Sequence, residues 1–402
     1  MNKKVIIVGG GAAGFFTAIN CAENNPNYEV IILEKSKEVL GKVKVSGGGR
    51  CNVTHACFVP DELVNFYPRG HKELLGPFHQ FMTGDTMAWF ENRGVPLKIE
   101  DDNRVFPQSN NASSIINCLI KQTEKHGIKV MTQVSVTGFK KKEATWHIET
   151  TQGSFYADAL VIASGGNSRV IWDNLRQLGH TIVDPIPSLF SFNTKDTRLR
   201  NLSGLVAENA AVNILGGKQV ENGPLLITHL GLSGSAILKL SSVTARALHE
   251  IGYKFTISVD WCENMTAHEI KQLFHQNRQE FPKKSILNTP LPSIPKRLWV
   301  SLVAHASITE KHKWAEVSNK LLGVLINFLK KSEIAINGKS TNKEEFVTCG
   351  GIDLKEIDFT TFGSKKQDNL YIVGEVLNID ALTGGFNFQA AWTGGFIVGK
   401  SL

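Results

Sequence analysis

The chain has 402 residues, which is enough for two or three domains. Hydrophobic residues make up 42% of it and charged residues 20%, so the composition excludes a disordered or fibrous protein. The formal net charge of +7 is a mild excess that a solvated basic surface explains, and it does not favour a nucleic-acid partner.

No CxxC pair occurs among the six cysteines, which are Cys21, Cys51, Cys57, Cys118, Cys262 and Cys349. We therefore expect reduced thiols, no metal site and a cytoplasmic location. The apolar stretch from Val5 to Cys21 imitates a secretory signal, but four glycines interrupt it. No other segment has the roughly 20 apolar residues of a membrane-spanning helix, so we expect no membrane association.

The first 34 residues predict a strand, a helix and a second strand. Val5–Val8 and Val30–Leu33 are short apolar runs, and the helical pattern Ala12–Glu23 separates them. Strands that are apolar throughout occur in sheets covered on both faces. The chain therefore opens as an α/β fold with parallel strands.

Two helices are expected next, over Lys72–Asn92 and Ser113–His126, the second with Ser109 and Asn110 as candidate caps. Three strands should follow, over Val130–Gly138, Thr145–Thr151 and Ala159–Ala163. The lysines at 140–142 are expected at a solvated hairpin tip.

The pattern changes near residue 185. Alternation of the β type continues to about Trp261, a helical pattern runs from Thr266 to Lys331, and a buried-strand pattern returns at Leu370–Gly374. We predict a discontinuous nucleotide-binding domain from residues 1–188 and 349–402. It is interrupted by a β-rich domain, from residues 189–262 and 332–348, and by a helical domain from residues 263–331.

A glycine fingerprint lies between the first strand and the first helix. Gly9, Gly11 and Gly14 have the spacing that lets a pyrophosphate approach the backbone at a helix N-terminus. Glu34 ends the second strand and follows Gly14 by about 20 residues, the separation at which a carboxylate binds a ribose. These features predict a dinucleotide site. The alternative is an ordinary glycine turn with a surface glutamate.

Further glycine-rich segments follow other predicted strands. They are Gly47-Gly48-Gly49-Arg50-Cys51-Asn52, Ala163-Ser164-Gly165-Gly166 and Gly374-Glu375. No second fingerprint occurs between a strand and a helix, so a separate nicotinamide domain is not expected. This favours FAD as the bound dinucleotide.

Several motifs, in order along nearly the whole chain, resemble those of the aminoacetone oxidase-like family of bacterial flavoproteins, known as NAD(P)/FAD-dependent oxidoreductases. They are VIIVGGGAAG from Val5, VSGGGRCNVTH from Val45, NRVFPQS from Asn103, ASGGNS from Ala163, LLITHLGLSGSAIL from Leu225, VTCGGIDL from Val347 and GEVLNIDALTGGFNFQAAWTGG from Gly374. SGGGRCN, THLGLSG and TGGFN are specific to this group.

The resemblance implies a two-dinucleotide-binding FAD domain with an inserted β-barrel-like domain and a helical cap. It implies that FAD is bound without a covalent bond by Gly9, Gly11, Ala12, Ala13, Gly14, Glu34, Lys35, Lys42, Gly48, Gly49, Arg50, Cys51, Val134, Ala163, Ser164, Gly165, Gly374, Glu375, Gly385, Phe386 and Asn387. Two residues depart from the family pattern: Asn378 stands where many relatives have Asp, and Ser164 where many have Thr.

Catalytic side chains are less well defined. His229 is a candidate base or substrate ligand, with a buried structural histidine as the alternative, and His55 is similar. Cys51 is a candidate thiol beside the flavin, or else a buried inert residue. Asn387 belongs to a segment whose N–H groups would stabilise the reduced ring. Arg104 would anchor an anionic substrate or form a surface ion pair.

We expect an oxidoreductase that acts on a small organic substrate. It would oxidise an amine or ketone-like compound, or reduce an enone-like compound with NAD(P)H as transient electron donor. An RNA-modifying flavoprotein is the runner-up, and a non-catalytic FAD-bound redox sensor is a third possibility. The RNA alternative rests on Lys283, Lys284, Lys296, Arg297, Lys311 and Lys313, with Trp299 and Trp314 as stacking or core residues. The oligomeric state is left open.

Overall fold

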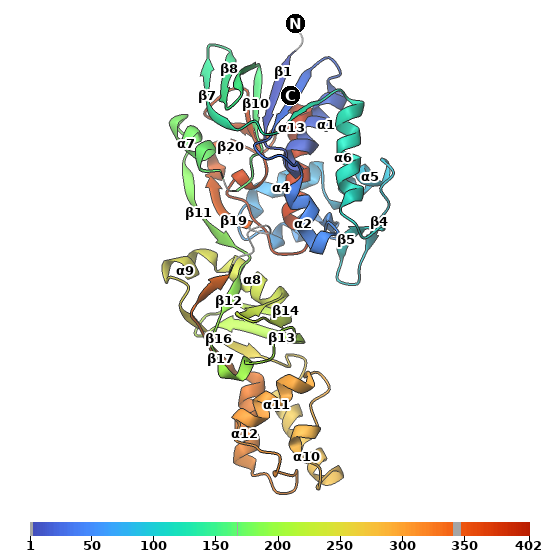
Figure 1. Cartoon of the computed structure of the whole chain (residues 1–402), viewed down its shortest axis with the longest axis vertical. Helices are drawn as coiled ribbons and strands as arrows, with labels where there is room; N and C mark the ends of the chain where they lie inside the picture. Colours follow the sequence, from blue (N-terminus) through green and yellow to red (C-terminus); the bar gives the residue numbers. More distant parts are fainter. Residues whose placement is uncertain (1–2, 167, 341–346) are drawn as a thin grey trace. The chain divides into compact units, whose positions relative to one another are not determined.

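The computed structural model describes residues 3–166, 168–340 and 347–402. It forms two compact units (Figure 1). Unit 1 consists of Met1–Ser188 and Lys343–Leu402, and unit 2 consists of Leu189–Asn342. Both ends of the chain therefore contribute to unit 1.

A seven-stranded sheet is the centre of unit 1, with the strand order β20-β21-β22-β10-β1-β2-β6. Its strands are β1 (Lys4–Val8), β2 (Glu29–Leu33), β6 (Lys129–Met131), β10 (Ala159–Ile162), β20 (Ile357–Asp358), β21 (Gly363–Ser364) and β22 (Leu370–Ile372). The strands from β22 to β6 are parallel, and β20 and β21 add an antiparallel edge. The predicted parallel strands from the two ends of the chain are confirmed.

Two helices pack together over this sheet: α1 (Ala12–Asn24) and α13 (Phe386–Ser401). A Cβ atom at Gly399 of α13 would lie 2.7 Å from Cβ of Asn20, and one at Gly395 would lie 3.0 Å from the carbonyl oxygen of Ala13. Glycines one turn apart therefore allow the two backbones to approach closely. This contact holds the N-terminal and C-terminal parts of unit 1 together.

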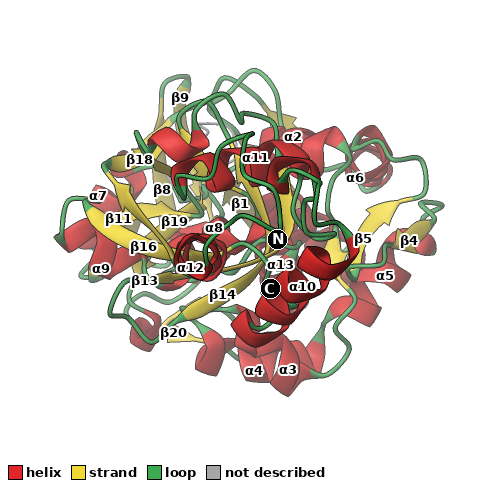
Figure 2. Ribbon diagram, turned by 90° about the horizontal axis from the view of Figure 1, so that it is seen from below, coloured by secondary structure: helices red, strands yellow, loops and turns green. Residues whose placement is uncertain are grey.

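The other helices of unit 1 are α2 (Gly41–Gly49), α3 (Pro60–Leu63), α4 (His71–Gln80), α5 (Thr83–Glu91), α6 (Ser113–Lys125) and α7 (Arg169–Gln177). Short 3-10 turns are η1 (Val64–Phe66), η4 (Leu354–Glu356) and η5 (Gly374–Val376). In Figure 2, α4, α5 and α6 lie near the lower and right edges of the view. One large apolar core runs between the sheet and these helices.

Two three-stranded sheets complete the periphery of unit 1. One contains β3 (Thr54–His55), β5 (Arg104–Pro107) and β4 (Leu97–Ile99), and the other contains β7 (Val136–Lys142), β8 (Thr145–Thr150) and β9 (Gly153–Ala157). The lysines at 140–142 end β7 in a hairpin, as predicted.

Two helix predictions need correction. The helix expected over Lys72–Asn92 is two helices, because the chain is extended at Phe81 and Met82 between α4 and α5. Ser109 and Asn110 do not cap α6. The N-cap residue is Ala112, and Oδ1 of the preceding Asn111 accepts a hydrogen bond from the N–H of Ser113, the first residue of the helix, at 2.9 Å.

Strands β11 (Ile182–Ser188) and β19 (Val347–Ile352) form a separate antiparallel pair in unit 1. Ser188, the last residue of the first segment of unit 1, lies opposite Val347. The chain therefore leaves unit 1 and re-enters it at neighbouring positions.

Unit 2 contains a seven-stranded antiparallel sheet with the order β17-β16-β13-β14-β15-β12-β18. The strands are β12 (Ser191–Asn193), β13 (Val206–Ile214), β14 (Val220–Ile227), β15 (Gly231–Ser233), β16 (Phe255–Asp260), β17 (Ser332–Ile336) and β18 (Gly338–Ser340). The helical elements are η2 (Thr197–Leu199), α8 (Ser235–Val243), α9 (Ala245–Glu250), α10 (Ala267–Glu280), η3 (Ile286–Asn288), α11 (Lys296–His305) and α12 (Asn319–Lys330).

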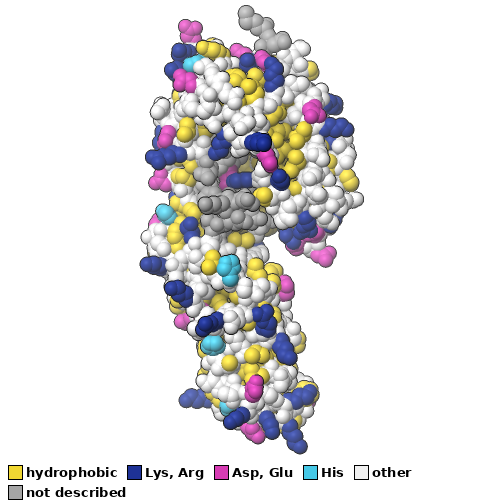
Figure 3. Space-filling view, in the orientation of Figure 1, with side chains coloured by type: hydrophobic (Ala, Val, Ile, Leu, Met, Phe, Trp, Pro, Cys, Tyr) yellow, Lys and Arg dark blue, Asp and Glu magenta, His cyan; other side chains and the backbone are white. Residues whose placement is uncertain are grey.

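Sheet and helices of unit 2 share one apolar core. Trp299 and Trp314 lie in it with no exposed surface, and their indole N–H groups donate to the carbonyl oxygen of Ile286 and to Oγ1 of Thr289. Of the two interpretations of these tryptophans, core packing is confirmed. Figure 3 shows lysine and arginine side chains over the part of unit 2 that contains α10, α11 and α12.

Candidate functional site

The turn between β1 and α1 requires glycine for steric reasons. Gly9 has φ +119°, and a Cβ atom there would lie 2.3 Å from the carbonyl oxygen of Ala163. A Cβ atom at Gly14 would lie 2.0 Å from the carbonyl oxygen of Gly9. Gly11 differs, because a Cβ atom there would have no described atom within 4 Å. The fingerprint therefore combines two packing glycines with one that borders open space.

That open space lies at the N-terminus of α1. Gly11 is the N-cap and Ala12 and Ala13 begin the helix, and the first turn has neither a side-chain cap nor an acidic residue. The first N–H groups of a helix have no partner within it and carry partial positive charge. This helix end is suited to bind an anion such as a pyrophosphate.

Glu34 stabilises the turn beside it. Its carboxylate accepts hydrogen bonds from the N–H of Gly10 at 2.7 Å and from the N–H of Ser36 at 2.8 Å. The N–H of Val134, a fully buried residue, donates to the carbonyl oxygen of Glu34 at 2.9 Å. Glu34 and Val134, predicted to border the adenosine, are thus neighbours, whereas the side chain of Lys35 is exposed.

The segment after β10 lies against the same turn. The N–H of Ala163 donates to the carbonyl oxygen of Val8, and its own carbonyl oxygen is the atom closest to Gly9. The hydroxyl oxygen of Ser164 is buried without a hydrogen-bond partner among the described residues. Gly165 has φ +73° and, like Gly11, borders open space.

The C-terminal segment reaches the N-terminus of α1 from the other side. A Cβ atom at Gly374, which has φ +76°, would lie 3.1 Å from Cβ of Ala13. The carboxylate of Glu375 lies 2.5 Å from Nζ of Lys42 and accepts a hydrogen bond from the N–H of Thr348 at 2.8 Å. Lys42 and Glu375 are therefore brought together from opposite ends of the sequence.

The SGGGRCN segment is a bent turn at the end of α2. Ser46, Gly47 and Gly48 have non-helical dihedral angles, and Gly48 and Gly49 border space that is largely open. The guanidinium of Arg50 lies 3.9 Å from the ring centre of Phe106 and forms a 2.7 Å ion pair with Glu100. The predicted cofactor residue Arg50 is thus held by neighbouring strands.

Cys51 is fully buried in a left-handed conformation with φ +62°. Burial raises the pKa of its thiol to about 12, and a hydrogen bond with Ser46 offsets this only in part. A thiol with that pKa is protonated at neutral pH, and the thiolate is the reactive form. Of the two interpretations of Cys51, the structure favours the buried inert thiol.

The TGGFN segment forms the N-terminus of α13. Gly385 is its N-cap with φ +97°, and a Cβ atom there would lie 2.6 Å from the carbonyl oxygen of Thr54. Phe386 is buried and stacks on Phe66, with ring centres 4.2 Å apart. Both polar atoms of the Asn387 side chain bond to the backbone of Ala381, so this amide fixes the preceding loop.

These residues fit a dinucleotide. Open space borders Gly11, Gly48 and Gly165, where a side chain would intrude. Buried oxygen atoms of Asn52, Ser164 and Asn378 have no hydrogen-bond partner among the described residues, although buried polar groups are normally paired. FAD has phosphate, ribose and ring groups that would satisfy such atoms.

Two other candidates lie outside this arrangement. His229 is exposed in the turn between β14 and β15 of unit 2, so the interpretation as a buried structural histidine is wrong. Arg104 forms a 2.6 Å ion pair with Asp102, which confirms the surface-pair interpretation. Cys57 is a partly exposed free thiol, and Cys51 is free as well.

A recess beside the TGGFN segment was not predicted. Its volume is about 520 Å³, and its lining includes His55, Phe58 and Phe66. Nδ1 of His55 lies 3.2 Å from the carbonyl oxygen of Gly384, and its ring centre lies 4.5 Å from that of Phe386. The recess could not be predicted from the sequence, because its lining residues show no periodic pattern and the contact of His55 with the C-terminal segment is visible only in the structure.

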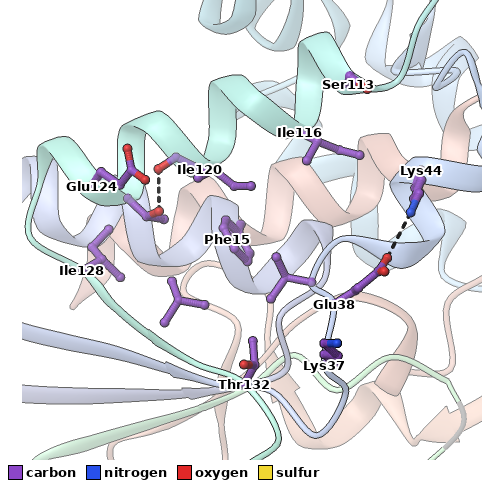
Figure 4. A pocket seen from close by; sticks show the side chains of 13 residues that line it. Phe15, Lys37, Glu38, Lys44, Ser113, Ile116, Ile120, Glu124, Ile128 and Thr132 are labelled. Carbon is purple, nitrogen blue, oxygen red and sulfur yellow. Dashed lines mark hydrogen bonds and ion pairs between the residues drawn. The ribbon is translucent and has the colours of Figure 1, made fainter.

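A second cavity, of about 540 Å³, lies between α1 and α6 (Figure 4). Phe15 of α1 and Ile116 and Ile120 of α6 point into it, and the ion pair of Glu38 with Lys44 lies at its rim. None of the residues predicted to bind the cofactor lines this cavity.

The glycine turn between β1 and α1, the carboxylate after β2 and the C-terminal segment against α1 define an α/β Rossmann-like FAD-binding fold. The chain belongs to the family described as HI0933-like protein Rossmann domain, which matches residues 3–401. The same comparison and the curated relatives place it among the FAD-dependent oxidoreductases.

Curated relatives match nearly the whole chain, among them a reductase and two ribosomal RNA dihydrouridine synthases. The 3-dehydro-bile acid delta(4,6)-reductase of Clostridium scindens is 27% identical, over 99% of this chain and 98% of the relative. The ribosomal RNA dihydrouridine synthase of Haemophilus influenzae is 26% identical, also over 99% and 98%. Among solved structures, 3-ketosteroid-delta4-(5alpha)-dehydrogenase from Rhodococcus jostii has a TM-score of 0.52 at 11% identity, covering 99% of this chain and 96% of that one. This last similarity concerns the fold alone.

No helix among the described residues combines the length and the apolar character needed to cross a membrane.

Proposed function

We propose that this chain is a reductase that uses non-covalently bound FAD to saturate a carbon–carbon double bond conjugated to a carbonyl group. NAD(P)H would be the reductant, in the cytoplasm, where six free thiols persist. The names of these curated relatives describe this chemistry: a 3-dehydro steroid with a delta-4 double bond is an enone, and dihydrouridine is uridine saturated next to its C4 carbonyl. The proposal therefore takes the enone-like alternative among the expected substrates.

The observation that carries the proposal is the convergence of chain segments in unit 1. The N-terminus of α1 meets the segments of Gly165 and Gly374, while the N-terminus of α13 meets Thr54 beside the recess of His55. The backbone N–H groups of α1 would hold the pyrophosphate. Those of α13, which has no acidic residue in its first turn, would stabilise negative charge on the reduced ring.

Saturation of the bond adds a hydride to one carbon and a proton to the other. When bound, FAD supplies the hydride after taking two electrons from NAD(P)H. The proton is proposed to come from His55. The carbonyl oxygen of Gly384 only accepts, so Nδ1 of His55 carries a hydrogen and Nε2 is the nitrogen that gains and gives the second proton.

The test follows the visible flavin absorbance of the FAD-loaded protein without oxygen. We expect NADH or NADPH to bleach the band and 2-cyclohexen-1-one or a delta-4 3-ketosteroid to restore it, with formation of the saturated ketone. The narrower resemblance to aminoacetone oxidase-like proteins predicts a different result: an amine bleaches the band, and oxygen alone restores it. That result would overturn the proposal.

The role of His55 has its own test. His55→Gln should lower the rate of enone reduction about 100-fold or more, as loss of a general acid does, and should remove the alkaline limb of the pH–rate profile, because a general acid loses its proton as the pH rises. FAD binding and bleaching by NAD(P)H should be unchanged. His71→Gln, an exposed histidine of α4, is the matched control and should behave as wild type.

A further inference from the structure

The charge of the chain is distributed very unevenly between its two units. Unit 2 contains 19 lysines and arginines against 11 aspartates and glutamates, a net charge of +8. Unit 1 is longer but contains 25 lysines and arginines against 26 aspartates and glutamates, a net charge of −1. The net positive charge of the protein therefore belongs to unit 2, which does not contain the glycine fingerprint.

Three helices of unit 2 have no acidic residue. They are α8, with the sequence SAILKLSSV, α11, with the sequence KRLWVSLVAH, and α12, with the sequence NKLLGVLINFLK. Two cations, Lys296 and Arg297, occupy the first turn of α11, where the helix dipole disfavours positive charge. Such an arrangement costs stability, which an anion bound there would offset.

Helix α11 contacts the loop around η2 through Arg297 and Ser301. A guanidinium nitrogen of Arg297 donates to the carbonyl oxygen of Asn201, and Oγ of Ser301 donates to that of Arg198 at 2.5 Å. The contact with Asn201 places Arg200 beside the start of α11. Arg200, Lys296 and Arg297, all exposed, form what we term the α11 cationic cluster.

Nearby acidic groups do not neutralise this cluster. Asp196 is paired with Arg198, and its pKa is lowered because the hydrogen bonds and charge of Arg198 outweigh its burial. Glu333 is exposed on β17 and its carbonyl oxygen accepts from Arg198. Within the described part of the chain, no carboxylate forms an ion pair with Arg200, Lys296 or Arg297.

We propose that the α11 cationic cluster binds the phosphate backbone of a folded RNA, as part of a basic surface on unit 2. The proposal rests on the proposed function, because the uracil ring has the required conjugated double bond and two curated relatives are named for ribosomal RNA. Trp299 and Trp314 are buried, so they offer no stacking surface, and recognition is through phosphates. This departs from the expectation drawn from total charge.

The test is RNA binding by the full-length, FAD-loaded protein as a function of salt. The probe is a labelled uridine-containing RNA hairpin, and the variant is Arg200→Gln/Lys296→Gln. The matched control is Lys72→Gln/Lys121→Gln, which removes two exposed lysines of unit 1. A plot of the logarithm of the RNA association constant against the logarithm of the salt concentration should have a slope smaller in magnitude by about 1.4 to 1.8 in the variant, and binding at low salt should be roughly tenfold weaker. The control should match wild type.

Three results would overturn the proposal: no RNA binding by wild type at low salt, equal losses in variant and control, or binding that salt does not weaken. Vesicles containing phosphatidylglycerol provide a further arm. Vesicle binding that depends on the cluster, without RNA binding, would assign the surface to a membrane instead. Reduction of 2-cyclohexen-1-one by the same preparations is measured in parallel, so that failure of RNA binding is distinguishable from failure of the proposed chemistry.

Discussion

Arg69 donates hydrogen bonds from two guanidinium nitrogens to the two carboxylate oxygens of Asp380, although 311 residues separate them in sequence. Asp380 is fully buried, and Oγ of Ser188 donates to the same carboxylate at 2.7 Å. The pair thus joins the segment before α4, the loop before α13 and the end of β11. These contacts fix the loop that leads to the proposed flavin-binding turn.

Replacing Asp380 with Asn should destabilise unit 1 by about 3 to 5 kcal/mol, because it leaves the Arg69 charge buried without its counter-ion. Chemical unfolding followed by tryptophan fluorescence measures the change. The double variant Arg69→Met/Asp380→Leu removes both charges and should recover most of the loss. A loss below about 1 kcal/mol in the single variant would show that the ion pair is not important for stability.

The three fingerprint glycines should respond differently to alanine. Gly9→Ala should severely destabilise the protein, since its Cβ would overlap the carbonyl group of Ala163. Gly11→Ala should leave the melting temperature of the FAD-free protein near that of wild type but weaken FAD binding at least tenfold, because the added methyl group enters the space proposed for the pyrophosphate.

Gly76→Ala is the control for both glycine variants. Gly76 is exposed in α4 with open space around it. The higher helix propensity of alanine is opposed by Pro77, which disfavours helical backbone at a preceding residue with a Cβ atom, so stability should stay within about 1 kcal/mol of wild type and FAD binding should be unchanged. Thermal unfolding and flavin fluorescence titration give the two quantities. If Gly11→Ala bound FAD as tightly as wild type, the cofactor would not lie against this turn.

Glu356 should make the protein sensitive to acid. Burial alone would raise its pKa, but hydrogen bonds from Lys366, Thr181 and His180 lower it to about 2. Since the folded-state pKa lies below the unfolded-state value near 4.5, the carboxylate stabilises the fold above pH 4.5 and this contribution is lost as the pH falls towards 2. Glu356→Gln should therefore lower the melting temperature at pH 7 and flatten its decline in acid.

Glu38→Gln is the matched control for Glu356, because Glu38 is exposed and forms its ion pair with exposed Lys44. It should melt as wild type does at pH 7. Equal effects of the two substitutions would contradict the assignment of the acid sensitivity to Glu356.

Native protein should react with iodoacetamide at one cysteine. Cys57 is partly exposed, whereas the other five are buried, and burial raises the pKa of Cys51 to about 12. Mass spectrometry should find one label per chain, slowly added because the pKa of Cys57 is itself raised by burial, and none in Cys57→Ser. Six labels are expected after unfolding. Rapid labelling of Cys51 in native protein would contradict its interpretation as a buried inert thiol and would favour a reactive thiol beside the flavin.

Local patterns predicted the elements around the β1–α1 turn because their cause is local. The apolar runs Val5–Val8 and Val30–Leu33 suit only strands covered on both faces, and the glycine spacing admits few other turns. Phe81 and Met82 continue the apolar spacing of a helix, so the break between α4 and α5 was not visible. Phe81 instead packs against Phe16 and Phe396, which are distant in sequence.

The candidate site could be predicted only in part for the same reason. Glycines with a fixed spacing predict a turn whose backbone a ligand can approach closely. The partners of Arg50, Lys42 and His55 are Glu100, Glu375 and Gly384, and no local sequence pattern identifies them. The charge of unit 2 was present in the sequence. It became informative only when the structure defined the boundaries over which to sum it.

The antiparallel pairing of β11 with β19 has a consequence for how such a chain changes over time. Since Ser188 and Val347 are partners in one ladder, a segment inserted between them begins and ends at adjacent points, about 5 Å apart. The intervening module can be exchanged for another of different size or charge while the register of the parallel sheet stays intact. The same FAD-binding unit can therefore carry different inserted domains, and a change of the inserted domain can change the substrate.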